Sequence, residues 1–179
     1  MLTHYETQLK TDKGCDSVKK SVELTITSNE AKVGQIMRDG GTDLIRLHVT
    51  EAIATYVSLL PSSRMVTPEA IVTMGQYLTE HPDIKHLSVT ELKTFFNLAF
   101  KQQRFGKLYG GFGYDTLLDW FNQFFEMRIQ EVVEYREKQH TYYTQNEKVR
   151  RDRSEGDAFG GFLQDIKTIY DGQQDNTTN

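Results

Sequence analysis

Residues 88–103 read Ser88-Val-Thr-Glu-Leu-Lys-Thr-Phe-Phe-Asn-Leu-Ala-Phe-Lys-Gln-Gln103 and carry the clearest helix signal in the sequence. Ser88 and Glu91 have the spacing of a capping box, in which each side chain accepts a hydrogen bond from the other residue's backbone N–H. The apolar residues that follow recur at helical spacing, so a broad helix face is expected to be buried: Leu92, Phe95, Phe96, Ala99 and Phe100. The segment predicts a helix over about 89–103.

A glycine-rich loop and a second helix follow this segment. The loop, 104–113, holds four glycines, which permit backbone angles that other residues resist. The next helix is expected to begin near Asp115 and to stay apolar on one side up to Val132, before the pattern turns polar toward Arg153. The two helices are therefore predicted to form the central hairpin of an all-α fold of five or six helices, the second of them long and C-terminal.

Three earlier helices are predicted from their start and stop signals. They cover 29–39, with Ser28 as N-cap and Gly40-Gly41 at the end; 42–60, stopped by Pro61; and about 67–80, started by Thr67-Pro68-Glu69 and ended by His81-Pro82.

The two ends of the chain are expected to be less ordered. Residues 1–27 lack sustained periodicity and are interpreted as a loosely structured lead-in, in which Val22, Leu24 and Ile26 alternate with polar residues as in a short strand or extended segment. Residues 154–179 are interpreted as a flexible acidic tail with a short amphipathic helix. The helical domain then spans 28–153.

Composition limits the class of protein. A chain of 179 residues with 37% hydrophobic residues is long enough for one compact domain. The single Cys15 excludes an intramolecular disulfide and fits a reducing cytoplasm, while the polar first 20 residues and the absence of a long apolar run argue against secretion and membrane insertion. The net charge of −4 excludes a globally basic nucleic-acid coat, although a local basic patch remains open.

Enzyme motifs are incomplete. Around Gly106-Lys107, Lys101 and Leu108 stand where a phosphate-binding loop needs Gly and Ser or Thr, and Thr116 stands where a dinucleotide fingerprint needs its third Gly. His81, His86 and Glu80 could share a metal, but no further His or Cys lies nearby, and solvated loop histidines are the simpler interpretation. We therefore expect no enzyme, cofactor or metal site.

A basic cluster with interleaved aromatic residues is the first candidate binding site. Its cations, with no acid among them, are Lys93, Lys101, Arg104 and Lys107; its aromatic residues are Phe105, Tyr109, Phe112 and Tyr114. Such a set suits phosphate neutralisation and base stacking. The alternative is a solvated helix face beside aromatic core residues.

Two further candidates lie toward the C-terminus. Lys148, Arg150, Arg151 and Arg153 could contact nucleic acid or an acidic partner, or they could simply complement the negative end of the helix dipole. The apolar stripe of the tail helix could dock into a partner's groove or onto the protein's own core; it comprises Phe162, Leu163, Ile166, Ile169 and Tyr170.

Four motifs lie within residues 87–146, about a third of the chain: Leu87-Ser-Val-Thr-Glu-Leu-Lys-Thr-Phe-Phe96, Phe105-Gly-Lys-Leu-Tyr-Gly-Gly-Phe112, Leu118-Asp-Trp-Phe121 and Tyr135-Arg-Glu-Lys138. With these motifs the segment resembles uncharacterised, helicase-loader-like, replication-associated accessory proteins of Bacteroidetes phages and mobile elements. Gly110-Gly111 departs from the single glycine that is more usual there. The resemblance implies a setting near a replicative helicase and transfers no catalytic residue.

The sequence thus predicts a non-enzymatic DNA-replication accessory or adaptor. Lys101 and Arg104 would contact phosphates, with Lys93, Lys107, Arg150 and Arg151 as further cations, while Phe105, Tyr109 and Gly110 would shape the loop that contacts a helicase-type partner. The alternative is a structural or oligomeric protein whose long helix, 117–153, pairs with a second copy. Gln139, His140 and Gln145 stand where a coiled-coil seam needs apolar residues, which weakens this alternative.

Overall fold

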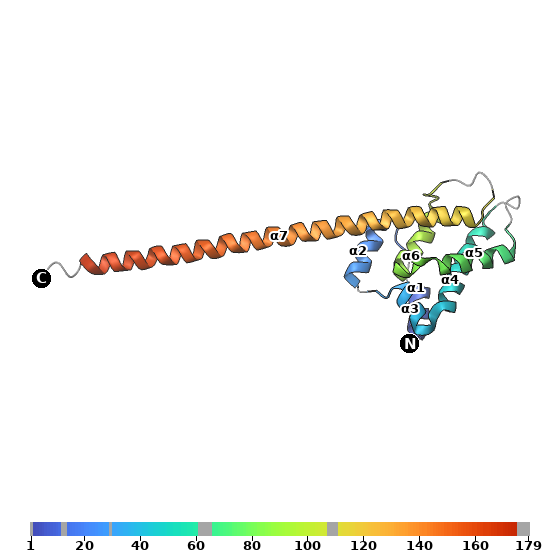
Figure 1. Cartoon of the computed structure of the whole chain (residues 1–179), viewed down its shortest axis with the longest axis horizontal. Coiled ribbons are helices and arrows are strands. Elements are labelled where there is room, and N and C mark those ends of the chain that lie inside the picture. The colour runs from blue at the N-terminus through green and yellow to red at the C-terminus, as the bar shows by residue number, and fades with distance from the viewer. Residues whose placement is uncertain (1, 12–13, 29, 61–65, 107–110, 175–179) are drawn as a thin grey trace. The chain divides into compact units, whose positions relative to one another are not determined.

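The computed structural model describes residues 2–11, 14–28, 30–60, 66–106 and 111–174, with residues 2, 11 and 148–174 described as backbone only. The helices are α1 (Leu2–Thr11), α2 (Val18–Ser28), α3 (Val33–Ile36), α4 (Thr42–Ser58), α5 (Pro68–Glu80), α6 (Val89–Phe96) and α7 (Tyr114–Gln174) (Figure 1). A wide π-helical turn, η1 (Met37–Gly41), joins α3 to α4, and a second, η4 (Asn97–Lys101), extends α6. A 3-10 helix, η3 (Pro82–His86), leads from α5 toward α6.

The predicted all-α fold with a central hairpin and a long C-terminal helix is confirmed. The ring of Phe95 on α6 lies 5.4 Å from that of Phe121 and 5.5 Å from that of Phe124, both on α7. All three side chains are fully buried. The hairpin of α6 and the start of α7 is thus held by aromatic packing at the centre of the core.

The predicted starts of α5 and α6 are also confirmed. Thr67 caps α5 by accepting a hydrogen bond from the Ala70 N–H, with Pro68 at the first helical position. At α6, the Ser88 N–H donates to Glu91 Oε2 over 2.7 Å and the Glu91 N–H donates to Ser88 Oγ over 3.1 Å. The expected capping box is therefore complete.

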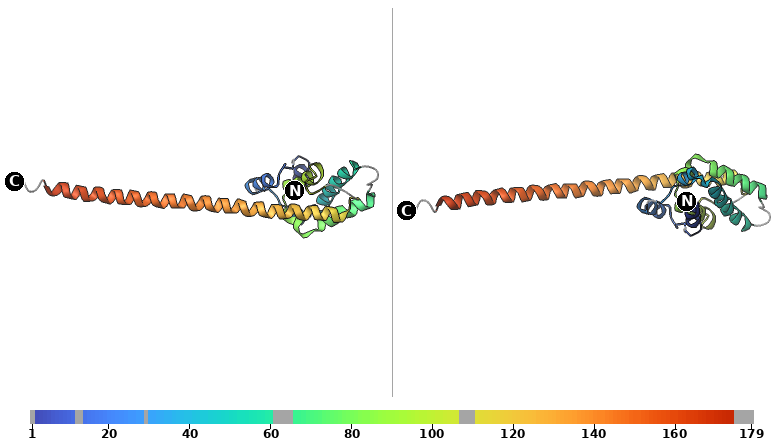
Figure 2. Two further views of the ribbon diagram at one scale, coloured as in Figure 1. Left: turned by 90° about the horizontal axis from the view of Figure 1, so that it is seen from above. Right: turned by 90° about the horizontal axis from the view of Figure 1, so that it is seen from below.

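Helices α4 and α5 lie side by side, as the two views of Figure 2 also show. Their close approach depends on Gly75, because a Cβ there would stand 2.1 Å from Thr50 Oγ1. Ile45, Val49 and Ile53 of α4 are fully buried, so α4 presents one continuous apolar face to the core.

The interpretation of residues 1–27 as a loose lead-in is wrong, because α1 and α2 lie there and contribute to the core. Tyr5 and Leu9 of α1 are buried one helical turn apart. In α2 the buried residues are spaced as in a helix rather than a strand, and two of them are polar: Val18, Ser21, Val22 and Thr25. Leu24 and Ile26, which suggested a strand, are 44% and 43% exposed.

The predicted helix over 29–39 is also corrected. Ser28 ends α2 instead of capping a new helix, and its Oγ donates to the Leu24 carbonyl. Helix α3 begins only at Val33, whose N–H donates to the Leu87 carbonyl over 2.8 Å. Gly40 adopts the expected left-handed conformation, with φ at 89°, inside η1.

The chain divides into two compact units, residues 1–133 and 134–179. The first unit contains α1 to α6 and the start of α7, and the second contains the remainder of α7. The backbone of α7 continues through 154–161, where a flexible stretch was expected. A glycine inside a helix costs only about 1 kcal/mol relative to alanine, so three glycines in this stretch do not force a break.

Candidate nucleic-acid interface

The predicted phosphate contacts lie where α6 ends. The π-helical turn η4 closes with the Gln102 N–H donating to the Asn97 carbonyl and the Arg104 N–H donating to the Leu98 carbonyl, over 3.1 Å and 3.0 Å. Gln103 between them has a left-handed φ of 49°. This turn places the side chains of Lys101 and Arg104 in solvent, and neither forms an ion pair with a described residue.

Lys101 and Lys93 line the same pocket, which has a volume of about 510 Å³. The loop before α2 closes one side of it at Gly14, where a Cβ would stand 2.6 Å from the carbonyl carbon and oxygen of Lys93. Lys93 is half-buried, and its Nζ donates to the Gln8 carbonyl on α1 over 3.3 Å. Lys93 thus also ties α1 to α6, a role that was not predicted. One carboxylate residue, Asp16, also lines this pocket.

His48 on α4 lines the pocket as well and was missed by the sequence analysis. Burial, with a smaller contribution from the positive charge of Lys93, lowers the pKa of His48 to about 4. The imidazole is therefore neutral at pH 7. Nothing in the local sequence distinguishes His48 from an ordinary residue of an amphipathic helix, because Lys93 is distant in sequence.

Three aromatic residues of the cluster, Phe105, Phe112 and Tyr114, take part in the core or pack against it. Phe112 is buried, with its ring 5.2 Å from Tyr56 and 5.9 Å from Trp120. Phe105 is half-buried, and its ring lies 6.3 Å from that of Phe95. The alternative interpretation, core packing, therefore applies to Phe112, and Phe105 faces the core at least in part.

Several predicted site residues lie outside the described part of the structure. Lys107, Tyr109 and Gly110 belong to the segment 107–110, which is not described. The remaining predicted residues lie within α7 where only the backbone is described: Arg150, Arg151, Phe162, Leu163, Ile166 and Ile169.

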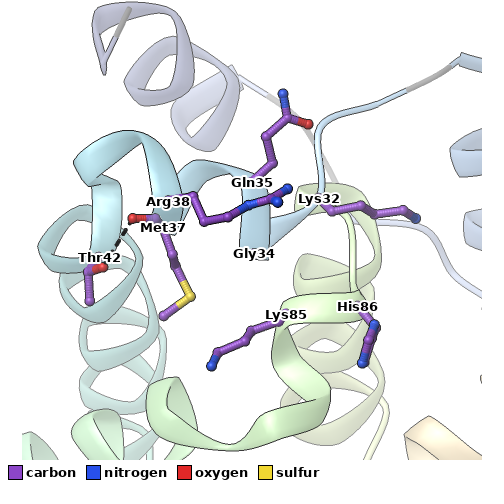
Figure 3. Close-up of a pocket in the computed structure, with 8 residues that line it drawn as sticks. All are labelled: Lys32, Gly34, Gln35, Met37, Arg38, Thr42, Lys85 and His86. Carbon is purple, nitrogen blue, oxygen red and sulfur yellow. Dashed lines mark hydrogen bonds between the residues drawn. The ribbon is translucent and has the colours of Figure 1, made fainter.

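A second basic pocket was not predicted (Figure 3). It has a volume of about 690 Å³, and its basic lining residues are Lys32, Arg38, Lys85 and His86. These residues come from three segments separated by up to 54 positions in the sequence, so no local cluster marks them. Only the adjacent pair Lys85-His86 carries a visible signal.

His81, which was considered for metal binding, and the single Cys15 both lie in packed parts of the fold. Nδ1 of His81 accepts a hydrogen bond from the Asp83 N–H at the start of η3, and its ring packs edge-on against Phe121. Cys15 is buried, and burial raises the pKa of its thiol. Among the described residues, no three His, Cys, Asp or Glu side chains form a group that could hold a metal ion. No described helix is long and apolar enough to cross a membrane.

Comparison of the chain with protein-family models, with curated proteins and with solved structures found no match.

Proposed function

We propose that this protein is a non-enzymatic, cytoplasmic accessory or adaptor in the DNA replication of a phage or mobile element, and that it binds DNA through the turn after α6. The observation that carries the proposal is the placement of Lys101 and Arg104 at that turn. Both side chains are exposed, and both lack an acidic partner in the described part of the chain.

Two unpaired cations three residues apart suit a phosphodiester backbone, because each can release a condensed counterion when it contacts a phosphate. Lys93 adds a further positive charge in the pocket that Lys101 lines. The net charge of the chain is −4, so the expected interaction is a local contact and not long-range attraction of DNA to the whole surface.

The partner in this proposal is a replicative helicase or a related protein. The choice of partner is motivated by the family resemblance of residues 87–146. This segment includes α6 and the first half of α7. The arrangement would place DNA and partner contacts on the same hairpin.

The test is fluorescence anisotropy with labelled single- and double-stranded oligonucleotides at about 50 and 200 mM salt. We expect binding that weakens with salt and that is lost in the double variant Lys101→Glu with Arg104→Glu. The matched control is Arg38→Glu with Lys85→Glu, which makes the same change in net charge at the second basic pocket. Equal loss in both double variants, or unchanged binding in the first, would contradict the proposed site.

A second candidate function is self-association through α7. Ile129 and Val133 lie one helical turn apart, and each is 48% exposed. Sedimentation equilibrium at several protein concentrations tests it, with Ile129→Glu and Val133→Glu as the variants. A wild-type monomer at all concentrations would remove this alternative, whereas a dimer that the variants dissociate would establish it.

A further inference from the structure

The second basic pocket brings together basic residues from segments far apart in the chain. Lys32 precedes α3, Arg38 lies in η1, and Lys85 and His86 end η3. The four residues line one pocket, and in Figure 3 Lys32 and Arg38 lie above Lys85 and His86. The fold therefore adds Lys32 and Arg38 to the adjacent basic pair Lys85-His86.

The lining of this pocket offers hydrogen-bond donors in excess of acceptors. None of the described residues that line it carries a carboxylate. Arg38 and Lys85 form no ion pair with a described residue, while Lys32 is partly compensated by the buried Glu91, whose Oε2 lies 3.5 Å from Lys32 Nζ. Ammonium and guanidinium groups only donate hydrogen bonds. A ligand with several negatively charged oxygens satisfies this lining best.

The backbone around the pocket is held tightly. Lys32 forms an antiparallel bridge with Ser88, and the adjacent Val33 N–H donates to the Leu87 carbonyl over 2.8 Å. Gly34 of α3 presses against η3, since a Cβ there would stand 2.9 Å from the Lys85 carbonyl oxygen. The segments that carry Lys32 and Lys85 are thus fixed relative to one another before any ligand arrives, which lowers the cost of ordering on binding.

From this geometry we infer that the pocket between α3, η1 and η3 binds a phosphate-bearing small molecule, with a polyphosphate held by Arg38 and Lys85 and assisted by Lys32. The volume of about 690 Å³ falls in the range of small-molecule sites. Met37 and the aliphatic stems of the lysines add apolar surface beside the charges. The inference is independent of the proposed DNA contact, which uses other residues.

Isothermal titration calorimetry of the full chain tests it, with pyrophosphate, ATP and adenosine as probes. We expect pyrophosphate and ATP to bind and adenosine not to bind. Tighter binding of ATP than of pyrophosphate would assign the site to nucleoside polyphosphates, and equal binding would assign it to the polyphosphate group alone. No binding of either at millimolar concentration would overturn the inference.

The variants separate this pocket from general charge effects. Arg38→Gln with Lys85→Gln changes only exposed side chains and is expected to weaken polyphosphate binding at least about tenfold, since charge-assisted hydrogen bonds are the stronger class. Lys19→Gln with Lys20→Gln removes the same charge from two exposed positions of α2 that do not line this pocket, and it is expected to leave polyphosphate binding unchanged. An equal loss in both double variants would overturn the inference.

Discussion

The charged side chains at the two ends of the helix formed by α6 and η4 differ in burial and in pairing. At the beginning, the buried carboxylate of Glu91 accepts a hydrogen bond from Arg128 Nε over 2.8 Å and lies 3.5 Å from Lys32 Nζ, while also capping the helix through the Ser88 N–H. At the other end, Lys101 and Arg104 stand in solvent without an acidic partner among the described residues.

This difference separates charges that stabilise the fold from charges that are free to bind. Glu91 is 1% exposed and connects α6 to α7 and to the segment before α3. An exposed cation without a partner contributes little to folding, so its removal changes stability only slightly. The same helix can therefore hold the core together at one end and offer a contact surface at the other.

The largest expected effect is from Glu91→Ala. The substitution removes the carboxylate that pairs with Arg128, whose side chain is only 14% exposed, and it breaks the capping box. Removing one partner of a buried pair leaves the other charge uncompensated, so we expect the free energy of unfolding to fall by about 3 to 5 kcal/mol. Urea denaturation followed by circular dichroism measures the change.

Glu69→Ala is the matched control, because Glu69 lies in the first turn of α5 but is exposed. There the loss is limited to the interaction with the helix dipole, about 0.3 to 1 kcal/mol. Similar losses in the two variants would show that the ion pairs of Glu91 contribute nothing beyond its position in the helix.

The second effect is a pH dependence of the free energy of unfolding. It arises from His48 in the pocket that Lys93 and Lys101 also line. Because the pKa of His48 is lowered from 6.5 to about 4 in the folded protein, the unfolded chain binds a proton between these values and the folded chain does not. The free energy of unfolding should therefore decrease as the pH falls from about 6.5 to 4, by at most about 3 kcal/mol from this residue. Denaturation at a series of pH values measures it.

His48→Gln provides the comparison for that experiment. The variant should lose the part of the pH dependence that belongs to His48, while the contributions of the carboxylates remain. Lys93→Met should raise the pKa of His48 and so reduce the pH dependence, because the charge of Lys93 disfavours protonation. Identical profiles for the wild type and His48→Gln would contradict a lowered pKa.

The third prediction concerns a steric contact between Gly14 and the middle of the helix formed by α6 and η4. In Gly14→Ala the new Cβ would stand 2.6 Å from backbone atoms of Lys93 and 2.7 Å from Asn97 Nδ2, so the loop or α6 must shift. We expect a loss of about 1 to 3 kcal/mol in denaturation experiments. Gly111→Ala is the control, since no atom would lie within 4 Å of its Cβ. A smaller loss at Gly14 than at Gly111 would contradict the close packing.

Local signals in the sequence were sufficient to predict helix starts where residues close in sequence form hydrogen bonds with one another. The cap of α5 by Thr67 and the box of Ser88 with Glu91 involve residues three positions apart, and both were predicted correctly. Helix α2 was missed because two of its buried positions are polar. Ser21 Oγ donates to the Val18 carbonyl, and Thr25 Oγ1 shares a hydrogen bond of 2.7 Å with Ser88 Oγ.

The candidate sites were predicted only in part, because charge compensation depends on distant residues. The sequence places Lys93 and Lys101 eight positions apart, but it does not show that Lys93 reaches Gln8 on α1. It identifies Glu91 as a cap and does not reveal Arg128, 37 positions away, as its partner. The pocket of Arg38 and Lys85 is likewise formed only when α3 and η3 come together.

The smallest expected effect on stability is at the exposed end of the helix formed by α6 and η4. Lys101→Gln with Arg104→Gln removes two positive charges from exposed positions, and Lys101 lies in the last turn, where a cation interacts favourably with the helix dipole. We expect the free energy of unfolding to fall by less than about 1 kcal/mol. Arg128→Gln removes a single charge at the buried pair and should cost more than both exposed changes together. If the exposed double variant were the less stable of the two in urea denaturation, these cations would belong to the fold, and the reason for assigning them to DNA would be lost.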